Sequence, residues 1–188
     1  MAVELELPVS VAARTALGIH PVPWPHGPAQ QFAAGRCAAA AALASAGSAD
    51  RVVPRDPDGR PVFPRGFPGS ISHTERMAVA AVVPGAEAVG VDIENAAVTE
   101  RMVRFVFRQR ERETLLAPAG EYVPRELFVA KEAAFKALNG IGAPGDFLFW
   151  QIELSRSGGT LNASYGGESV PVWVRSQPDL SLAVAIRR

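Results

Sequence analysis

Two pairs of segments in this chain resemble each other, and this internal resemblance constrains the fold more than any other feature. Residues 36–43 and 131–138 are rich in alanine and align without gaps, and residues 77–82 and 181–186 are short apolar runs. Alanine favours helices, whereas short apolar runs between turn signals favour strands. Each half would then hold a helix followed by strands, which predicts an α+β pseudo-dimer. Because alanine-rich helices resemble one another easily, a chance match stays open at this point.

Helices and strands are expected at defined places. Runs with no internal proline predict helices at residues 30–46, 98–116 and 124–138, with Gly47 ending the first and Asn139-Gly140 the last. Apolar runs predict two buried strands, 70–83 and 88–94, joined by a turn at Pro84-Gly85. Further strands are expected around residues 147–154, 161–165, 171–174 and 180–186. The Asp58-Gly59 turn suits two small strands within residues 51–62, and residues 21–28 and 64–69 are expected to be loops.

Length and charge bound the domain organisation and the partners. The chain has 188 residues, of which 48% are hydrophobic, so it can form one sizeable core and is not a disordered tail. We expect one domain over residues 1–188, with halves at about 1–84 and 85–188. Lys plus Arg equals Asp plus Glu at 19 each, so no long-range field favours nucleic acid or a membrane. Any anion site must therefore be built from a few placed residues.

Cysteine usage and the N-terminal residues indicate a cytoplasmic protein. The one cysteine, Cys37, can form neither an internal disulfide nor a cysteine metal cluster, and Glu4 and Glu6 stand where a signal peptide would be basic. The longest uncharged stretch, residues 15–35, is interrupted by prolines, so no membrane-spanning helix is expected. No Ser-His-Asp order, Cys-His pair or glycine-rich phosphate loop is recognisable in the sequence, which disfavours covalent catalysis and nucleotide-binding folds.

An acidic pair occurs in the segment Gly-Val-Asp-Ile-Glu that ends at Glu94. Asp92 and Glu94 are two residues apart on an expected strand, so both project from one face while Val91 and Ile93 point into the core. Paired carboxylates on one face are a common way to hold Mg²⁺. The alternative interpretation is a solvated acidic pair at a strand end.

The helix expected at residues 124–138 carries a second candidate group. Lys131, Phe135 and Leu138 share one stripe, at i, i+4 and i+7, whereas Glu132 and Lys136 lie on an adjacent stripe. Glu132 could supply a third carboxylate beside Asp92 and Glu94, and Lys136 could face a phosphate one turn away. The alternative interpretation of Glu132 and Lys136 is an exposed salt bridge that contributes about 0.2–0.5 kcal/mol.

Small hydroxyls and a histidine precede the buried apolar run at residues 77–83. In the segment Gly-Ser-Ile-Ser-His-Thr, residues 69–74, Ser72 and His73 could present donors to an anion. A structural or solvated histidine in a turn is the alternative.

Taken in order, the sequence blocks resemble the 4′-phosphopantetheinyl transferases. The blocks are Gly35-Arg36 at a helix, Arg55 before Gly59-Arg60-Pro61, and the segments 69–74, 90–94 and 131–136. The chain is most similar to the surfactin-type branch, in the subgroup that resembles enterobactin synthetase component D. The joint occurrence of Gly-Val-Asp-Ile-Glu with Lys-Glu-Ala-x-x-Lys is highly specific.

The resemblance implies a fold and an activity. The expected fold is α+β, a pseudo-twofold arrangement of two similar α/β halves with the active site between them. The expected reaction transfers phosphopantetheine from coenzyme A to a serine of an apo acyl or peptidyl carrier protein and releases 3′,5′-ADP. A monomer that depends on Mg²⁺, with Mn²⁺ as a substitute, would serve secondary-metabolite assembly lines such as those for siderophores, nonribosomal peptides or polyketides. The different-class alternative is a non-catalytic regulator that binds coenzyme A or a carrier protein on the same fold, and an unrelated metal-binding domain is a third.

The same resemblance assigns roles to individual residues. Asp92, Glu94 and Glu132 would hold Mg²⁺ against the pyrophosphate, and Lys136 would stabilise or protonate the leaving phosphate. Guanidinium groups suit phosphate well. The residues expected at coenzyme A are Arg36, Arg55, Gly59, Arg60, Pro61, Ser72, His73, Lys131 and Lys136.

A general base and a carrier surface are also implied. Glu111 matches a family glutamate proposed to deprotonate the carrier serine, with Glu132 as a rival and Glu113 as a near neighbour. Residues 98–112 interleave arginines with apolar residues and are expected to bind the acidic helix of the carrier, a solvated basic face being the alternative. The residues of this surface are Arg101, Met102, Val103, Arg104, Phe105, Val106, Phe107, Arg108, Arg110 and Arg112. One departure from the family pattern is Phe128-Val129, where the family often has Trp or Phe followed by Ser.

Overall fold

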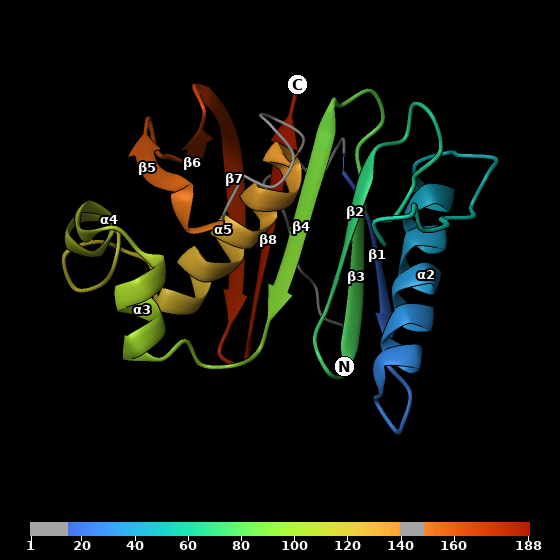
Figure 1. Ribbon diagram of the computed structural model, residues 1–188, viewed down its shortest axis with the longest axis horizontal. Coiled ribbons are helices and arrows are strands. Elements are labelled where there is room, and N and C mark those ends of the chain that lie inside the picture. Colours follow the sequence, from blue (N-terminus) through green and yellow to red (C-terminus); the bar gives the residue numbers. More distant parts are fainter. Residues whose placement is uncertain (1–14, 140–148) are drawn as a thin grey trace.

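The first of two sheets is three-stranded and antiparallel. The computed structural model describes residues 15–139 and 149–188. Strands β1 (Ala16–Pro21), β2 (Gly69–His73) and β3 (Met77–Val82) pair in the order β1-β3-β2. Helix α2 (Pro28–Ser45) packs on one face of this sheet, where Ala38, Ala42 and Leu43 are buried against the strands (Figure 1).

The second sheet is five-stranded and antiparallel. Its strands pair in the order β4-β8-β7-β6-β5, and helix α5 (Pro124–Leu138) packs against it. Two short helices, α3 (Glu100–Val106) and α4 (Gln109–Thr114), connect β4 to α5, and a 3₁₀ turn, η1 (Phe149–Gln151), precedes β5. The strands are β4 (Ala88–Glu94), β5 (Glu153–Ser157), β6 (Thr160–Tyr165), β7 (Glu168–Gln177) and β8 (Leu180–Arg187).

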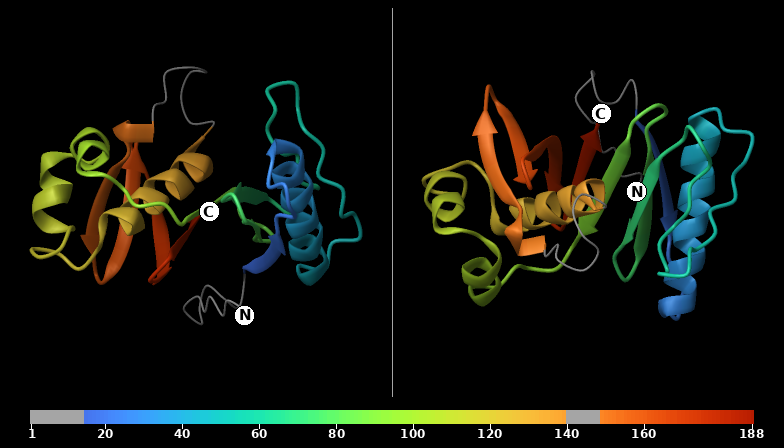
Figure 2. Two further views of the ribbon diagram at one scale, coloured as in Figure 1. Left: turned by 90° about the horizontal axis from the view of Figure 1, so that it is seen from below. Right: turned by 45° about the horizontal axis from the view of Figure 1, so that its top comes forward.

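The two sheets pack together through their inner faces, with the helices outside. Val79 of β3, Val91 of β4 and Val184 of β8 belong to one buried cluster between the sheets. Figure 2 shows α2 on one side of the molecule and α3 to α5 on the other. Strand β2 lies beside β4 at the seam. The arrangement β1-β3-β2 with α2 corresponds to β4-β8-β7 with α5, which confirms the expected α+β fold of two similar halves.

Two glycines show that the helical part of the internal resemblance is structural. A Cβ atom on Gly18 of β1 would clash with the carbonyl oxygen of Ala38, and one on Gly90 of β4 would clash with that of Ala133. Ala38 and Ala133 are matched residues in the alignment of 36–43 with 131–138. Each helix therefore approaches the corresponding strand at the same place, and only glycine permits this distance.

The alignment of the strands is wrong by one residue. Gly18 pairs with Ala80, and Gly90 pairs with Ala185, so the structure matches Ala80 with Ala185. The sequence alignment instead matched Ala80 with Val184. A slip of one residue exchanges the two faces of a strand. Accordingly, Ala80 and Ala185 face the helices, whereas Val184 lies between the sheets.

The helix expected at residues 98–116 is interrupted. Phe107 and Arg108 have extended backbone angles between α3 and α4, and the side chain of Glu111 accepts a hydrogen bond from the Arg108 amide over 2.7 Å. The helix expected at 124–138 is present with those bounds, although Gly140 after it lies outside the described residues. The helix expected at 30–46 begins two residues earlier, at Pro28.

Several strand predictions also differ from the structure. The segment 70–83 holds two strands, β2 and β3, because a tight turn at residues 74–76 reverses the chain. Pro84-Gly85 connects the two sheets instead of forming a hairpin, and residues 51–62 form a single bridge between Arg55 and Pro61. Strand β1 was not expected, and the start of the strand placed at 147–154 lies outside the described residues. Within the described residues, no helix is long and apolar enough to cross a membrane.

Candidate functional site

Asp92 lies at the seam between the sheets and is held from both sides. Its side chain is nearly buried, and Oδ1 accepts a hydrogen bond from Ser72 Oγ of β2 over 2.7 Å. The same oxygen accepts from Lys136 Nζ of α5 over 2.8 Å, and Lys136 also donates to the carbonyl of Val91 over 2.9 Å. Asp92 therefore joins β2, β4 and α5 at one point.

Glu132 lies one helical turn before Lys136 and is coupled to the carboxylates of β4. Burial raises the pKa of Glu132, and the charges of Asp92 and Glu94 raise it further, while Lys136 opposes the shift. Asp92 and Glu94 share one face of β4, and Glu132 lies one turn before Lys136, which contacts Asp92. We call Asp92, Glu94 and Glu132 the carboxylate cluster. The interpretation of Glu132 and Lys136 as a solvated surface pair does not fit this arrangement.

The carboxylate cluster has the donor chemistry of a magnesium site. Carboxylate oxygens are the ligands that Mg²⁺ prefers, and a divalent cation would relieve the repulsion that raises the pKa of Glu132. Glu94 Oε1 here accepts from the amides of Asn95 and Ala96, over 2.8 and 2.7 Å. Over residues 15–139 and 149–188, no three His, Cys, Asp or Glu side chains stand close enough to hold a metal as they are. The Lys136 ammonium supplies the positive charge that Asp92 faces.

A pocket of about 280 Å³ lies between α2, the 55–61 loop and β2. Among the residues that the resemblance assigned to coenzyme A, those lining this pocket are Arg36, Arg55, Gly59, Pro61 and His73. Phe32 also lines it, although this residue was not among those expected from the sequence. The spacing gave a usable signal, because Phe32 and Arg36 are one helical turn apart. We call this the arginine pocket.

Two guanidinium groups stack on one ring in the arginine pocket. The Cζ atoms of Arg36 and Arg55 lie 4.5 and 4.4 Å from the centre of the Phe32 ring. Burial lowers the pKa of Arg36, and the neighbouring charge of Arg55 lowers it further. Arg36 Nε is buried and has no hydrogen-bond partner among the described residues. An anion placed here would satisfy that donor and relieve the repulsion between two cations.

Four residues assigned to coenzyme A lie outside this pocket lining, namely Arg60, Ser72, Lys131 and Lys136. Ser72 points to Asp92, whereas its neighbours Ile71 and His73 line the pocket. Arg60 is exposed in the loop, and its amide donates to Asp56 Oδ1 over 2.7 Å, which shapes the turn that carries Gly59.

Lys131 and Glu111 form a fully buried ion pair. Lys131 Nζ lies 2.8 Å from Glu111 Oε2, and neither side chain has exposed surface. Burial lowers the pKa of Lys131, while the charge and hydrogen bond of Glu111 oppose the shift. In this arrangement neither side chain is exposed to a ligand, which differs from the roles expected for Lys131 and Glu111. The stripe that Lys131 shares with Phe135 and Leu138 was a signal of its burial.

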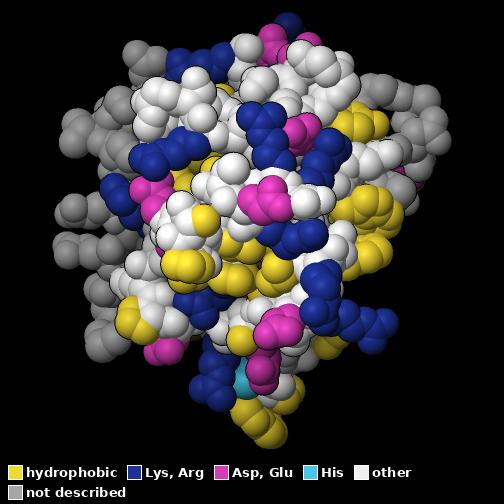
Figure 3. Space-filling view, turned by 90° about the vertical axis from the view of Figure 1, so that its left-hand side faces the viewer, with side chains coloured by type: hydrophobic (Ala, Val, Ile, Leu, Met, Phe, Trp, Pro, Cys, Tyr) yellow, Lys and Arg dark blue, Asp and Glu magenta, His cyan; other side chains and the backbone are white. Residues whose placement is uncertain are grey.

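The surface expected to meet a carrier protein is partly buried. Val106 and Phe107 are core residues, whereas Phe105 is 67% exposed and its ring centre lies 5.4 Å from that of Trp150, which is 40% exposed. Met102 is also exposed, and we call Met102, Phe105 and Trp150 the α3 patch. Figure 3 shows this side of the molecule, with hydrophobic side chains among those of Lys and Arg. Trp150 was not among the residues expected at this surface, because it is distant from them in sequence.

Some arginines of this surface bind other residues of the chain, and others are free to meet a partner. Arg108 pairs with Glu153 over 3.0 Å and donates to the Gln151 carbonyl, and Arg112 donates to the Phe107 carbonyl. Arg104 is exposed and lies 3.9 Å from Glu100. The exposed side chains that are available for an acidic partner are Arg101, Arg104 and Arg110.

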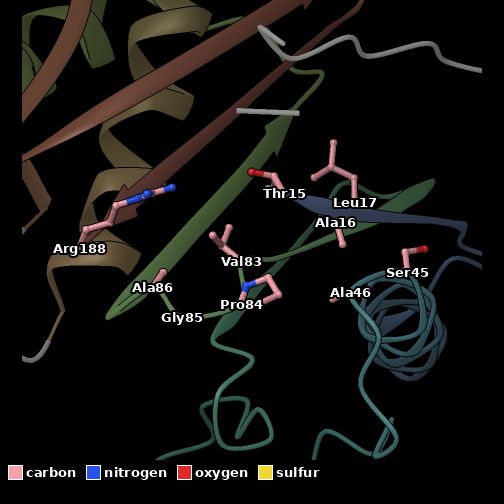
Figure 4. Close-up of a pocket in the computed structure, with 10 residues that line it drawn as sticks. All are labelled: Thr15, Ala16, Leu17, Ser45, Ala46, Val83, Pro84, Gly85, Ala86 and Arg188. Atoms are coloured by element: carbon pink, nitrogen blue, oxygen red, sulfur yellow. The ribbon is translucent and has the colours of Figure 1, made fainter. Parts of the chain in front are cut away.

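A larger hollow lies away from this chemistry. It measures about 750 Å³ and is bordered by the ends of β1, α2 and β3 and by Arg188 (Figure 4). Most of its lining is alanine, valine, proline and glycine, and among the described residues no carboxylate side chain lines it. The larger hollow is therefore not the candidate site. The candidate site consists of the arginine pocket and the carboxylate cluster.

Comparisons with known proteins cover most of the described chain. Residues 28–83 match the family model of the 4′-phosphopantetheinyl transferase N-terminal domain, and residues 88–185 match that of the 4′-phosphopantetheinyl transferase superfamily. The chain is similar to 4′-phosphopantetheinyl transferase Npt of Nocardia iowensis, with 33% identity over 112 residues. That alignment covers 57% of this chain and 50% of the relative, so the chain spans about half the length of this curated relative.

Proposed function

Because the chain belongs to the 4′-phosphopantetheinyl transferase superfamily, we propose that it transfers the phosphopantetheine group of coenzyme A to a serine of an apo carrier protein. The serine oxygen would attack the phosphorus that carries the pantetheine arm. A phosphorus–oxygen bond of the pyrophosphate would break, 3′,5′-ADP would leave, and the serine proton would pass to a base. The surfactin-type branch, a monomeric state and the division into halves at residues 84 and 85 belong to the same proposal.

One observation carries the proposal: β2 connects the arginine pocket to the carboxylate cluster. His73 lines the pocket, and the preceding residue, Ser72, donates to Asp92. Successive residues of a strand face opposite sides, so one strand end serves both sites. A molecule with an anionic nucleotide at one end and a pyrophosphate next to it has the charge distribution that these neighbouring sites would bind.

The arginine pocket would bind the adenine nucleotide. Phe32 offers an aromatic surface, and Arg36 and Arg55 offer guanidinium donors suited to phosphate. The buried Arg36 Nε has a donor available for an anion. Because these charges are placed locally, a chain with no net charge can still bind a highly anionic substrate.

Asp92, Glu94 and Glu132 would hold Mg²⁺ or Mn²⁺. When bound, this ion would neutralise charge on the pyrophosphate as its bond breaks. Lys136, fixed by Asp92 and the Val91 carbonyl, would place an ammonium beside the leaving phosphate.

Glu132 is the base that the geometry supports. It belongs to the carboxylate cluster, next to which the phosphorus would be held, and it is only partly buried. Glu111, the other candidate, has both carboxylate oxygens engaged in the interior.

The α3 patch would bind the carrier protein. Phe105 and Trp150 would provide apolar anchors, and the exposed arginines of α3 would steer an acidic helix. Acyl and peptidyl carrier proteins of secondary-metabolite assembly lines are the substrates we propose.

Intact-mass spectrometry of apo carrier proteins tests the reaction. The protein, coenzyme A and Mg²⁺ are incubated with a panel of carriers, beside an Asp92→Ala variant. A mass gain of one phosphopantetheine group that is lost in the variant would support the proposal. Coenzyme A binding without any gain on a broad panel would instead favour the non-catalytic regulator, and absence of both would contradict the proposed function.

A further inference from the structure

The buried pair of Lys131 and Glu111 is hydrogen-bonded to backbone groups of several chain segments. Lys131 Nζ lies 2.8 Å from Glu111 Oε2 and also donates to the carbonyls of Val106 and Ile152, over 3.0 and 2.8 Å. An ammonium has three protons, so each finds an acceptor. The cation is thereby shared between the end of α3, the start of α4 and the connection from η1 to β5.

Glu111 is satisfied in the same way. Its Oε2 accepts from the amide of Arg108 over 2.7 Å, and its Oε1 accepts from the amide of Leu154 over 2.6 Å. Removing a pair of charges from water is costly, and the cost is offset here by complete hydrogen bonding. If this pair served only to fill space in the core, apolar side chains would be sufficient. These charges do something that apolar side chains cannot: they fix backbone groups of distant segments relative to α5.

Those backbone groups are neighbours of the α3 patch. Phe105 immediately precedes Val106, and Trp150 lies two residues before Ile152, so the Lys131 ammonium holds both segments that carry the exposed aromatic pair. On the other side, Lys131 immediately precedes Glu132 of the carboxylate cluster. The ion pair thus lies between the patch that would bind the carrier and the helix that would act on it.

We propose that Lys131 and Glu111 are positioning residues that set the spacing of Phe105 and Trp150 relative to Glu132. They do not touch coenzyme A or the serine. They affect how well the carrier protein is bound, because they hold the backbone at Val106 and Ile152. The expected effect on carrier kinetics rests on the proposed function. The claim that the ion pair sets the positions of Phe105 and Trp150 does not.

Two variants test the proposal in the full-length protein. Glu111→Gln removes one charge and one hydrogen-bond acceptor, and the double variant Glu111→Gln with Lys131→Met removes both charges, so that no buried charge is left unpaired. Glu87→Gln is the matched control, because Glu87 also pairs with a cation, Arg187, over 3.5 Å, at the end of β4 away from Glu94. Cooperative thermal unfolding confirms that each variant is folded.

The kinetic result expected is a split between the two substrates. The KM for the carrier rises by roughly 10- to 100-fold, because displaced aromatic anchors lose contacts with the carrier. The affinity for coenzyme A, measured by calorimetry, stays unchanged, and the control behaves as the wild type. A merely structural role would lower thermal stability without separating the two substrates. An unchanged carrier KM in a folded double variant would overturn the proposal.

A spectroscopic measurement separates this proposal from the proposed function. In a background with Trp24→Phe and Trp173→Phe, Trp150 is the one remaining tryptophan, and acrylamide quenching reports its exposure. We expect stronger quenching in the double variant than in the same background with the pair intact. If even the wild type modifies no carrier, the proposed function fails. The quenching measurement still shows whether the ion pair positions Trp150. Unchanged quenching would contradict the geometric part.

Discussion

Ser72 Oγ donates a hydrogen bond to Asp92 Oδ1 over 2.7 Å, and this contact ties the first sheet to the second at the candidate site. Lys136 reaches the same oxygen from α5 over 2.8 Å. The orientation of Asp92 thus depends on residues from both halves of the chain. Because β2 also carries His73 of the arginine pocket, a change at Ser72 would be felt at both ends of the proposed coenzyme A site.

Replacing Ser72 by alanine is expected to weaken both stability and transfer. A hydrogen bond to a charged group contributes about 1.5–3 kcal/mol, so the midpoint of thermal unfolding should fall. The transfer rate should fall by about tenfold or more, since Asp92 loses one of two donors. Ser70→Ala is the matched control, because Ser70 is buried two residues earlier on the same face of β2. Equal effects of the two substitutions would contradict a specific role for Ser72.

The pocket residues are best tested by comparing two ligands. Arg36→Gln should weaken coenzyme A binding by about 10- to 100-fold, because charge-assisted hydrogen bonds contribute about 1.5–3 kcal/mol. If Arg36 binds the 3′-phosphate, the loss for dephospho-coenzyme A should be much smaller. Calorimetry with both ligands makes the comparison, and Arg51→Gln, an exposed arginine outside the pocket lining, serves as the control. Equal losses for the two ligands would assign Arg36 to another part of the nucleotide.

Glu132→Gln is expected to stabilise the metal-free protein while it abolishes transfer. The pKa of Glu132 is raised in the folded state, so the folded protein binds its proton more tightly than the unfolded chain does. The stability due to this group is therefore fully present below the unfolded pKa and is lost as the pH rises through the raised folded pKa. The variant has no such loss, and its advantage over the wild type in a chelator should grow with pH over that window.

The same variant distinguishes the effect of bound metal on stability from the effect of charge repulsion within the carboxylate cluster. Mg²⁺ should raise the unfolding temperature of the wild type and have little effect on Glu132→Gln, whereas transfer should fall by about 10²–10⁴-fold if Glu132 is the base. Scanning calorimetry with and without Mg²⁺ makes this measurement. A variant that is less stable than the wild type in chelator at neutral pH would contradict the electrostatic coupling of the cluster.

Local spacing explains which parts of the site could be predicted from sequence. Asp92 and Glu94 are two residues apart on a strand, and Glu132 and Lys136 are one turn apart on a helix. These relationships depend on backbone geometry within one element, which the sequence pattern specifies. The family resemblance then brought the two elements together, and the 2.8 Å contact between Lys136 Nζ and Asp92 Oδ1 joins them in the structure.

Packing between distant elements explains what could not be predicted. Lys131 is a charged residue in a helix, and its burial depends on Glu111 and on the carbonyl groups of Val106 and Ile152, which come from three other segments. The strand register failed for a similar reason, since Ala80, Ala185 and Val184 are all small or β-branched apolar residues. Hydropathy alone does not distinguish their faces, whereas the contact of Gly18 with α2 does.

The α3 patch leads to a prediction about association with the carrier. Phe105 is 67% exposed, and its ring centre lies 5.4 Å from that of Trp150, so the two rings together present a large apolar surface to solvent. Phe105→Ala should weaken carrier affinity by about 2 kcal/mol, or about 30-fold, as expected for an aromatic anchor at an interface. Stability should change little, because the ring is largely in water.

Charge reversal at Arg104 should act differently from removal of the Phe105 ring. Arg104 is exposed and is held only by a 3.9 Å pair with Glu100, so Arg104→Glu should mainly slow association, and the effect should shrink as salt is added. Arg108 is unsuitable for this test, because its bonds to Glu153 and the Gln151 carbonyl hold η1 and β5. Stopped-flow binding at two ionic strengths distinguishes the two substitutions: Phe105→Ala should raise the dissociation rate at both, and Arg104→Glu should lower the association rate at low salt. An Arg104→Glu variant with an unchanged association rate at low salt would show that this face of α3 does not meet the acidic carrier.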